Sequence, residues 1–363
     1  MKVIFPFNRD LNPLVSLLIS GLRDAGCFVD QGTMMFWDRT LFDYDIVHIQ
    51  WPETLFDWRI PTEIELILLR QRLQEIRQRA KIIYTVHNRE SHHANSESAA
   101  ILKELYTLVE QECDVMVHLG EASKAEYQNR PEFTRQQHVM IPIPVYDALY
   151  SQFLSVTPKE AKGRLGVPQN KKIVLAFGNF RYEQEKQLVL SAVSALKKRH
   201  FCLVAPKWYK AHEYFFSFIY PMLSLRSARK YFWAWRNGLK LGVKKTMSDE
   251  EVALYFTAAD VVFIQRVDEL NSGNIPMAFL FRKTVLGPDQ GNIGQWLRLT
   301  GNPVFDPVDN FSLQSALENA LKLSDTDKGE ENYTFAMTHW LTKKICMEHE
   351  ILYKSVFNDI KIQ

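Results

Sequence analysis

The stretch KIVLAFGNFR, residues 172–181, indicates the fold of this 363-residue chain most directly. Its first six residues are almost all apolar, which is typical of a strand buried on both faces of a parallel sheet. A glycine follows at once, and a helical period begins near residue 184. Apolar runs and helical periods alternate in the same way on both sides of this stretch, which predicts an α/β fold.

The same alternation divides the chain into two halves. Strands are predicted at Lys2–Phe7, Asp45–Trp51, Lys81–His87, Val115–Leu119, His138–Ile143, Lys172–Phe177, His200–Ala205, Asp260–Gln265 and Thr284–Gly287. Helices are predicted at Leu14–Asp24, Ile64–Arg79, Leu102–Cys113, Ala122–Gln128 and at about 184–197, 248–258, 274–282 and 312–323. A polar linker is expected near 150–170, and the chain after about 327 has only helical spacing. We therefore predict two Rossmann-like domains over 1–150 and 151–335, with a C-terminal helix over 336–363.

Composition excludes several classes of protein. The apolar fraction of 46% and the charged fraction of 24% are those of a globular chain, and the length fits two domains. The net charge of +2 predicts neither a nucleic-acid coat nor an acidic partner. The four cysteines contain no C-x-x-C pair, so neither a disulfide framework nor a structural zinc site is expected. With no long apolar run and no signal-peptide pattern, a cytoplasmic protein is expected.

Polar residues follow the predicted strands of the first half. Asn12 can cap the next helix with Pro13 at its first position, whereas a cap has no need of Arg9. His87, directly before Asn88, can hydrogen-bond a sugar hydroxyl or a phosphate, or move a proton. A structural role is the alternative for a histidine. His92 and His93 lie nearby, but their spacing does not fit a metal site, and none is expected.

Two loops of the second half have the features of phosphate sites. Gly178 allows a close approach of the backbone, and Arg181 with the following helix would stabilise a phosphate. The acidic residues of that helix can simply belong to its first turn. Ser272 and Gly273 precede another helix, and Glu269 can accept hydrogen bonds from a ribose diol. A plain capping loop is the alternative.

Taken together, these loops resemble bacterial glycosyltransferases of the family 4 type, which have the GT-B fold. The resemblance covers most of the chain. It is carried by Asn12-Pro13, DIVHIQWPE at 45–53, TVHN at 85–88, IPIPVYDALY at 141–150, EAKGRLGVPQNKKIVLAFGNFR at 160–181, SDEEVALYFTAADVVF at 248–263, LNSGNIPMAF at 270–279 and VLGPDQG at 285–291.

The resemblance implies two domains that face a central cleft, with the C-terminal helix crossing back to the N-terminal domain. It implies a UDP- or GDP-linked sugar donor in the second domain, an acceptor in the first, transfer with retention, and no bound metal or other cofactor. Its candidate catalytic residues are His87 and Glu269. Its candidate donor-binding residues are Gly178, Arg181, Lys186, Glu269, Asn271, Ser272 and Gly273, and its candidate acceptor-binding residues are Arg9, Asn12, Gln50, Trp51 and Asn88.

The sequence also departs from the family's pattern. Relatives often have histidine where Gln50 and Ile143 stand, and a second donor-loop glutamate where Pro276 stands. Arg282 replaces a usual glycine, and Thr284 a usual proline. These changes bear on donor identity and on catalysis.

The segment 207–245 differs from the rest of the chain and is predicted to be an insertion in the second domain. It holds nine Lys or Arg and one acidic residue, a net charge of +8, and eleven of the 28 residues at 208–235 are aromatic. Such a composition suits contact with anionic lipid. The alternative is aromatic core packing below a solvated basic face.

The leading hypothesis is therefore a hexosyltransferase-type enzyme that transfers sugar from a nucleoside diphosphate to a polysaccharide or lipid-linked saccharide. It would act in the cytoplasm, in peripheral contact with the inner face of the cell membrane, in building bacterial cell-surface polysaccharide. A non-catalytic relative that binds a membrane or an assembly partner is the second hypothesis. A sugar epimerase is the third, and it leaves the acceptor-side resemblance without a role.

Overall fold

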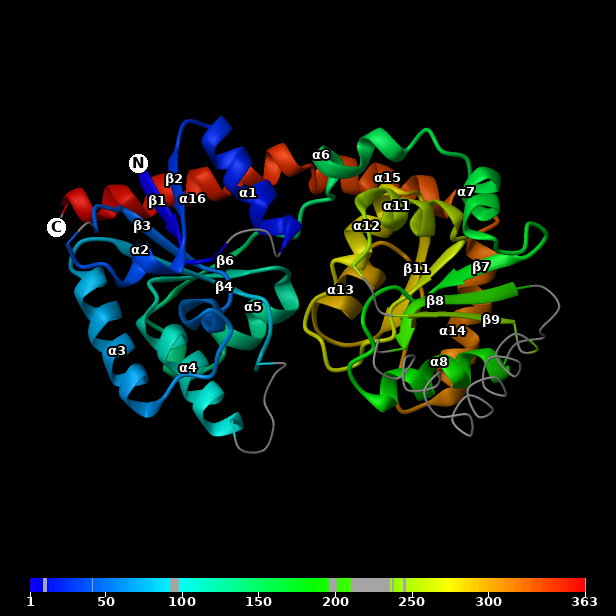
Figure 1. Ribbon diagram of the computed structural model, residues 1–363, viewed down its shortest axis with the longest axis horizontal. Helices are drawn as coiled ribbons and strands as arrows, with labels where there is room; N and C mark the ends of the chain where they lie inside the picture. Colours follow the sequence, from blue (N-terminus) through cyan, green and yellow to red (C-terminus); the bar gives the residue numbers. More distant parts are fainter. Residues whose placement is uncertain are drawn as a thin grey trace, which may run out of the picture. The chain divides into compact units, whose positions relative to one another are not determined.

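The computed structural model describes residues 1–8, 12–40, 42–91, 98–195, 201–209, 236, 238–243 and 246–362. The chain forms two compact units, here called unit 1 (Met1–Pro144 with Trp340–Gln363) and unit 2 (Val145–His339). Each unit contains one six-stranded sheet whose described strand pairs are all parallel. The predicted α/β fold with parallel sheets is therefore confirmed (Figure 1).

In unit 1 the strand order is β2-β1-β3-β4-β5-β6. The strands are β1 (Lys2–Phe5), β2 (Phe28–Gln31), β3 (Ile46–Ile49), β4 (Lys81–Val86), β5 (Val115–His118) and β6 (Gln137–Met140). The helices are α1 (Pro13–Asp24), α2 (Thr33–Trp37), α3 (Glu63–Arg77), α4 (Ala99–Glu112), α5 (Glu121–Gln128) and α16 (Thr342–Ile362), with 3-10 turns at Pro52–Phe56 and Pro131–Phe133.

The C-terminal helix α16 belongs to unit 1, as predicted, and packs against α1 (Figure 1). A glycine permits the close contact, because a Cβ on Gly21 would lie 2.2 Å from Sγ of Cys346. Ile345, Leu352 and Tyr353 of α16 are buried in the same apolar cluster as Val3 and Phe5 of β1. The last helix is thus part of the core of the N-terminal domain.

In unit 2 the strand order is β12-β11-β10-β7-β8-β9. The strands are β7 (Lys172–Leu175), β8 (Phe201–Tyr209), β9 (Leu239–Val243), β10 (Val261–Phe263), β11 (Thr284–Pro288) and β12 (Val304–Phe305). The helices are α6 (Asp147–Tyr150), α7 (Pro158–Leu165), α8 (Glu183–Ala195), α11 (Asp249–Ala258), α12 (Asn274–Leu280), α13 (Gly291–Leu299), α14 (Asn310–Leu323) and α15 (Lys328–His339), with a 3-10 turn at Ser151–Phe153.

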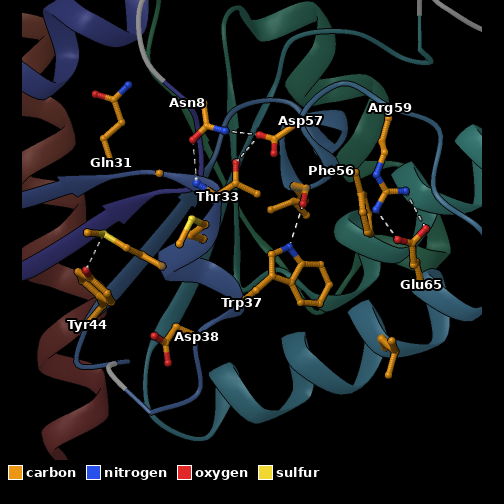
Figure 2. Close-up of a pocket in the computed structure, with 15 residues that line it drawn as sticks. Asn8, Gln31, Thr33, Trp37, Asp38, Tyr44, Phe56, Asp57, Arg59 and Glu65 are labelled. Atoms are coloured by element: carbon orange, nitrogen blue, oxygen red, sulfur yellow. Dashed lines mark hydrogen bonds and ion pairs between the residues drawn. The ribbon is translucent and has the colours of Figure 1, made fainter.

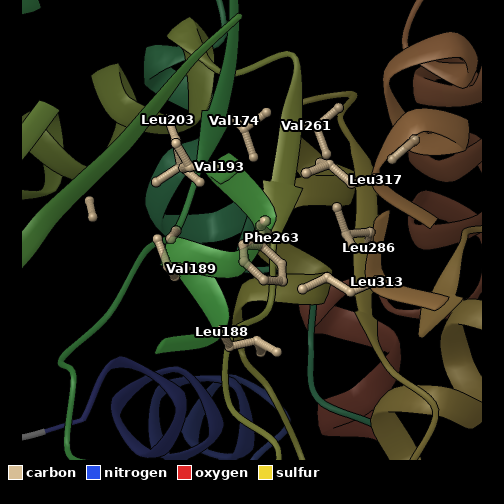
Figure 3. Packing of buried hydrophobic residues seen from close by; sticks show 14 of the residues in the cluster. Val174, Leu188, Val189, Val193, Leu203, Val261, Phe263, Leu286, Leu313 and Leu317 are labelled. Carbon is tan, nitrogen blue, oxygen red and sulfur yellow. The ribbon is translucent and has the colours of Figure 1, made fainter. Parts of the chain in front are cut away.

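The core of unit 2 forms between its sheet and the packed pair α8 and α14. Phe263 of β10 lies among Val189, Leu286 and Leu313 in this core (Figure 3). The helices α7 and α11 pack together, as do α12 and α15. This packing fixes the strand ends from which the loops of unit 2 emerge.

Three parts of the sequence interpretation need correction. The expected linker at 150–170 contains helix α7, which Thr157 caps through the backbone N–H of Glu160 and which packs on α11. The mostly polar sequence of α7 gives no apolar helical period, because Ala161 is the one fully buried apolar residue through which α7 contacts α11. Strand β2 was not predicted, since its sequence FVDQ at a sheet edge has no apolar run.

The third correction concerns the segment 207–245. Residues 207–209 extend β8, and Leu239–Val243 form β9, which pairs with β8 in parallel. Residues 207–209 and 239–243 thus belong to the sheet rather than to an insertion. The residues between them that carry most of its aromatic rings, 210–235, lie outside the described residues.

Candidate functional site

The loop after β7 approaches the loop after β10 at a position that requires glycine. Gly178 has φ of +113°, a conformation that L side chains rarely adopt. A Cβ at this position would lie 3.1 Å from Nη2 of Arg266, which follows the end of β10. A side chain at residue 178 would therefore be strained and would press on the guanidinium.

Two arginines converge on Glu269 in unit 2. Arg181 forms an ion pair with Glu269 through Nη1 and Oε1, and Nη1 of Arg266 lies 3.8 Å from the same oxygen. Nη2 of Arg266 also donates to the backbone carbonyl of Asn179 at 3.3 Å. Burial, and then the nearby charge of Arg181, lowers the pKa of Arg266, but a guanidinium remains charged at neutral pH. The strand ends thus hold two cations beside one carboxylate.

Three buried polar atoms lie in or next to this cluster without a hydrogen-bond partner in the part of the chain that the structure describes. They are Nε of Arg266, Oδ1 of Asn179 and Nε2 of Gln265. Leaving such an atom unpaired costs about 1–3 kcal/mol, so native proteins satisfy nearly all of them with protein, water or ligand. At the ends of β7 and β10, water, a ligand or residues outside the described ranges would have to supply these partners.

The N-terminus of α8 is occupied by a carboxylate from its own first turn. Oε2 of Glu185 accepts a hydrogen bond from the backbone N–H of Arg181 at 2.7 Å. Burial raises the pKa of Glu185, opposed by that hydrogen bond. Glu185 therefore belongs to the first turn of α8, which was one of the interpretations of the sequence. An incoming phosphate would meet the guanidinium groups rather than the backbone of Arg181.

Two lysines add positive charge near the same strand ends. Nζ of Lys186 lies 5.8 Å from the ring centre of Trp208, and Nζ of Lys207 lies 5.4 Å from that of Phe177. Trp208 in turn contacts Phe180, with ring centres 4.9 Å apart. Lys207 of β8 thus lies beside the loop after β7. The positive charge of the two lysines near these strand ends suits the binding of an anion.

The loop at 270–274 is fastened to its neighbours. Nδ2 of Asn274 donates to the backbone carbonyl of Phe177 at 2.8 Å, which joins the start of α12 to the loop after β7. Oδ1 of Asn271 accepts from Nδ2 of Asn292 at 2.8 Å. Ser272 accepts from the backbone N–H of Asn274 at 3.4 Å, and a Cβ on Gly273 would lie 3.0 Å from the hydroxyl of Tyr146. The predicted donor loop therefore adjoins the arginine cluster.

Unit 1 has a second polar cluster, at the ends of β3 and β4. Gln50 accepts through Oε1 from Nε2 of His87 at 2.8 Å, and its Nε2 lies 3.0 Å from Nε2 of His48 and 3.3 Å from the hydroxyl of Thr85. His48 and Thr85 are themselves 2.7 Å apart. All four side chains are buried. Gln50 therefore sits at the centre of this network.

His87 is held as a neutral ring between this network and Trp51. The two rings stack with centres 4.1 Å apart and an interplanar angle of 17°. Burial lowers the pKa of His87 to about 3, so the imidazole is uncharged at neutral pH. A neutral imidazole can hydrogen-bond a hydroxyl or accept its proton, but it has no positive charge with which to bind an anion.

The sequence interpretation missed residues that complete both clusters. Tyr353 of α16 hydrogen-bonds Nδ1 of His48, and His349 of α16 lies with its ring centre 5.7 Å from that of His48. No local signal reveals these contacts, because about 300 residues separate the partners. Arg266 carried a usable signal, a charge directly after a predicted strand.

The remaining candidates have other places. Asn12 caps α1 by accepting from the backbone N–H of Leu14 at 2.9 Å, as predicted. The side chain of Asn88 hydrogen-bonds Tyr106. Arg9, His92 and His93 lie outside the described residues. Within the described ranges, no three His, Cys, Asp or Glu side chains are grouped as a metal site would require, and no helix has the length and hydropathy to cross a membrane.

Comparison with known proteins identifies the architecture. No protein-family model and no curated protein matches the chain. Sucrose-phosphate synthase from Thermosynechococcus elongatus aligns over 99% of both chains with a TM-score of 0.69 and 14% identity. Anabaena HepE in complex with UDP and glucose aligns over 98% of this chain and 100% of its own, with a TM-score of 0.66 and 13% identity.

The fold is GT-B. The catalytic domain of starch synthase IV from Arabidopsis thaliana, bound to ADP and acarbose, shares it over 98% of this chain and 99% of that domain, with a TM-score of 0.66 and 10% identity. At such identities the similarity establishes the fold and leaves activity to be argued from the site.

Proposed function

We propose that this chain is a glycosyltransferase of the family 4 type that holds a nucleoside-diphosphate sugar in unit 2. The observation that carries the proposal is the convergence of Arg181 and Arg266 on Glu269 at the strand ends. A GT-B fold and the sequence resemblance support it, as does the UDP bound in the HepE structure. Open α/β sheets bind ligands at the carboxyl ends of their strands.

The two arginines would neutralise the leaving diphosphate. In transfer, the bond between the anomeric carbon and the diphosphate oxygen breaks, and its electron pair leaves with that oxygen. Guanidinium groups positioned before the reaction stabilise this charge without reorganisation. Glu269 keeps both arginines in place and would orient the donor. Lys186 and Lys207 add to the positive field, so these cations would perform the charge neutralisation that a metal ion performs elsewhere.

Unit 1 would hold a saccharide acceptor through Gln50, Trp51 and His87. A bond forms between the acceptor oxygen and the anomeric carbon, and the hydroxyl proton passes to the departing diphosphate oxygen. Neutral His87 would hydrogen-bond the acceptor or the transferred sugar. Retention of configuration and a hexose donor rest on the family resemblance. A lipid-linked acceptor and a place at the cytoplasmic face of the membrane rest on the sequence of 207–245.

Nucleotide-dependent thermal stabilisation tests the donor site. UDP or GDP should raise the melting temperature of the wild-type chain, because a ligand that binds only the folded state stabilises it. Arg181→Ala should weaken that nucleotide about 10- to 100-fold, which corresponds to the loss of one charge-assisted contact.

The matched control is Arg164→Ala, which removes an arginine exposed on α7 in an ion pair with Glu250. It should leave nucleotide affinity unchanged. If neither UDP, GDP nor ADP stabilises the wild-type chain, and a panel of their sugars undergoes no hydrolysis, the transferase assignment is wrong.

A further inference from the structure

A large cavity of unit 1 lies beside the strand ends of β1 and β2 and is separate from the network around Gln50. Its volume is about 1010 Å³, at the upper end of the range for small-molecule sites. Residues from the loops after β1, β2 and β3 and from helices α2 and α3 line it (Figure 2). None of the candidate acceptor residues that the structure describes is among them.

One end of the cavity is polar and rigidly built. Oδ1 of Asp57 accepts from the hydroxyl of Thr33 at 3.0 Å and also from Nδ2 of Asn8, and Oδ1 of Asn8 accepts from the backbone N–H of Thr33 at 3.3 Å (Figure 2). Asp57 and Trp58 have φ of +53° and +66°, so two successive residues other than glycine are left-handed. Such strain persists where surrounding structure enforces it, and it clusters at binding sites. This turn points the carboxylate of Asp57 at Thr33 and Asn8.

The charge of the described lining residues disfavours an anionic ligand. Its acidic side chains are Asp38, Asp57 and Glu65, and its basic side chain in the described part of the chain is Arg59. Arg59 is bound through both terminal nitrogens to Glu65 and holds the pKa of that carboxyl down to about 2. Negative charge therefore exceeds positive charge, whereas hydroxyl groups could bond to Asn8 and Asp57.

The opposite wall of the cavity is apolar and continues onto the surface. Met34 and Met35 of α2, Phe56 of the 3-10 turn at Pro52–Phe56 and Leu68 of α3 contribute to it, and Met34 is 85% exposed. Beyond Leu68, Ile64 and Ile67 are also exposed, which gives α3 an outward apolar stripe at i, i+3 and i+4. The inward side of α3 is buried through Leu66, Leu69 and Leu73, so the packing of α3 in unit 1 does not use the stripe.

We propose that this cavity binds an uncharged amphiphile, with its hydroxyl-bearing head at Asn8 and Asp57 and its hydrocarbon chain over Met34, Met35 and Leu68. This site lies apart from Gln50, Trp51 and His87, the proposed contacts of the acceptor sugar, and the proposal does not depend on the proposed function. The tail would continue along the stripe of Ile64 and Ile67. Methionine side chains adapt to flexible hydrocarbon, and burial of the chain provides the driving force.

The shape and chemistry favour a chain with a head over the other occupants. A free saccharide would leave the methionine wall and the stripe uncovered. A phosphorylated head would face the excess of carboxylates. A flat protein partner would cover the stripe but would leave a cavity of about 1010 Å³ unfilled.

Binding of n-octyl β-D-glucoside below its micelle concentration tests the proposal on the full chain. Isothermal titration should show octyl glucoside binding at least about 10-fold more tightly than free glucose or n-octyl phosphate, because only the neutral amphiphile matches both ends. An octyl glucoside with a photoreactive diazirine in its chain should label residues 31–38 and 55–68. UDP affinity, measured on the same samples, reports the donor site of unit 2 independently.

Leu68→Gln should weaken octyl glucoside about 10-fold, and Asp57→Asn, which keeps a residue that tolerates the left-handed turn, should weaken it less. The control Ile351→Gln alters an exposed isoleucine of α16 and should change nothing. Equal binding of glucose or octyl phosphate, labelling elsewhere, or insensitivity to Leu68→Gln would overturn the proposal. So would self-association in sedimentation that Ile64→Glu abolishes while octyl glucoside fails to bind. UDP binding in that event would leave the proposed function standing.

Discussion

The polar clusters at the strand ends of the two units are built from opposite chemistry. Unit 2 gathers Arg181 and Arg266 beside Glu269, with Lys186 and Lys207 over the rings of Trp208 and Phe177. Unit 1 gathers neutral imidazole, amide and hydroxyl groups around Gln50, with Trp51 stacked on His87. Two sheets of the same parallel type thus carry cationic groups at the strand ends of unit 2 and uncharged polar groups at those of unit 1. Cations suit a diphosphate, and neutral hydrogen-bonding groups beside an aromatic ring suit sugar hydroxyls.

The largest expected effect comes from removing a buried cation of unit 2. Arg266→Met should lower nucleotide affinity about 100-fold, because it removes a charge-assisted donor and leaves Glu269 with Arg181 alone. Titration of UDP and GDP measures it. The same substitution at exposed Arg164 should have no effect. An Arg266→Met variant with unchanged affinity for UDP and GDP would contradict the contrast between the two units.

Gln50→Leu should destabilise unit 1 by about 2–3 kcal/mol. The change removes the acceptor of the His87 Nε2 hydrogen bond and one of the partners of His48 and of Thr85, and the loss of hydrogen bonds at a buried site carries a desolvation cost. Urea unfolding, followed by signals from unit 1, measures the loss. Gln74→Leu, on the surface of α3, is the control. A loss below about 0.5 kcal/mol would show that the network contributes little to stability.

Acid should weaken unit 1 through its buried histidines. Burial lowers the pKa of His87 to about 3 and that of His349 to about 4, both below the ordinary 6.5. The unfolded chain therefore binds protons that the folded chain excludes, so stability is complete above 6.5 and falls as the pH drops toward these values. At pH 5.5 each such histidine costs about 1.4 kcal/mol.

Urea midpoints at pH 7.5 and 5.5 test this pH dependence. His87→Gln should reduce the difference between the two pH values by one histidine's contribution. An unchanged difference in His87→Gln would show that this imidazole is not held neutral by the fold.

The smallest expected effect is that of Lys186→Met, because its ammonium lies over the Trp208 ring at the edge of the arginine cluster. We expect nucleotide binding to weaken about 2- to 5-fold at low salt, with the difference fading as salt increases. Titration at two salt concentrations measures it. A salt-independent loss as large as that of Arg266→Met would place Lys186 in direct contact with the ligand.

Much of the fold could be predicted from local pattern. Apolar runs such as KIVLAF and KIIYTVH identify central strands, because both faces of those strands are buried. Edge strand β2 and helix α7 escaped prediction since their few apolar contacts leave no period in the sequence. The candidate residues Arg181, Glu269, Gln50 and His87 could be found because each follows a strand closely.

The sequence by itself determined the alternation of strands and helices, the cap at Asn12 and the residues available at the strand ends, since these depend on near neighbours. Only the tertiary structure decided which of those residues meet. Tyr353 hydrogen-bonds His48, although about 300 residues separate them in the sequence. Arg266 and Arg181 lie beside the same carboxylate, that of Glu269. Glu185 accepts from the backbone N–H of Arg181 before α8, where the sequence predicted a phosphate. It also decided that α3 keeps an apolar stripe outside, because packing, unlike periodicity, shows which face has no partner.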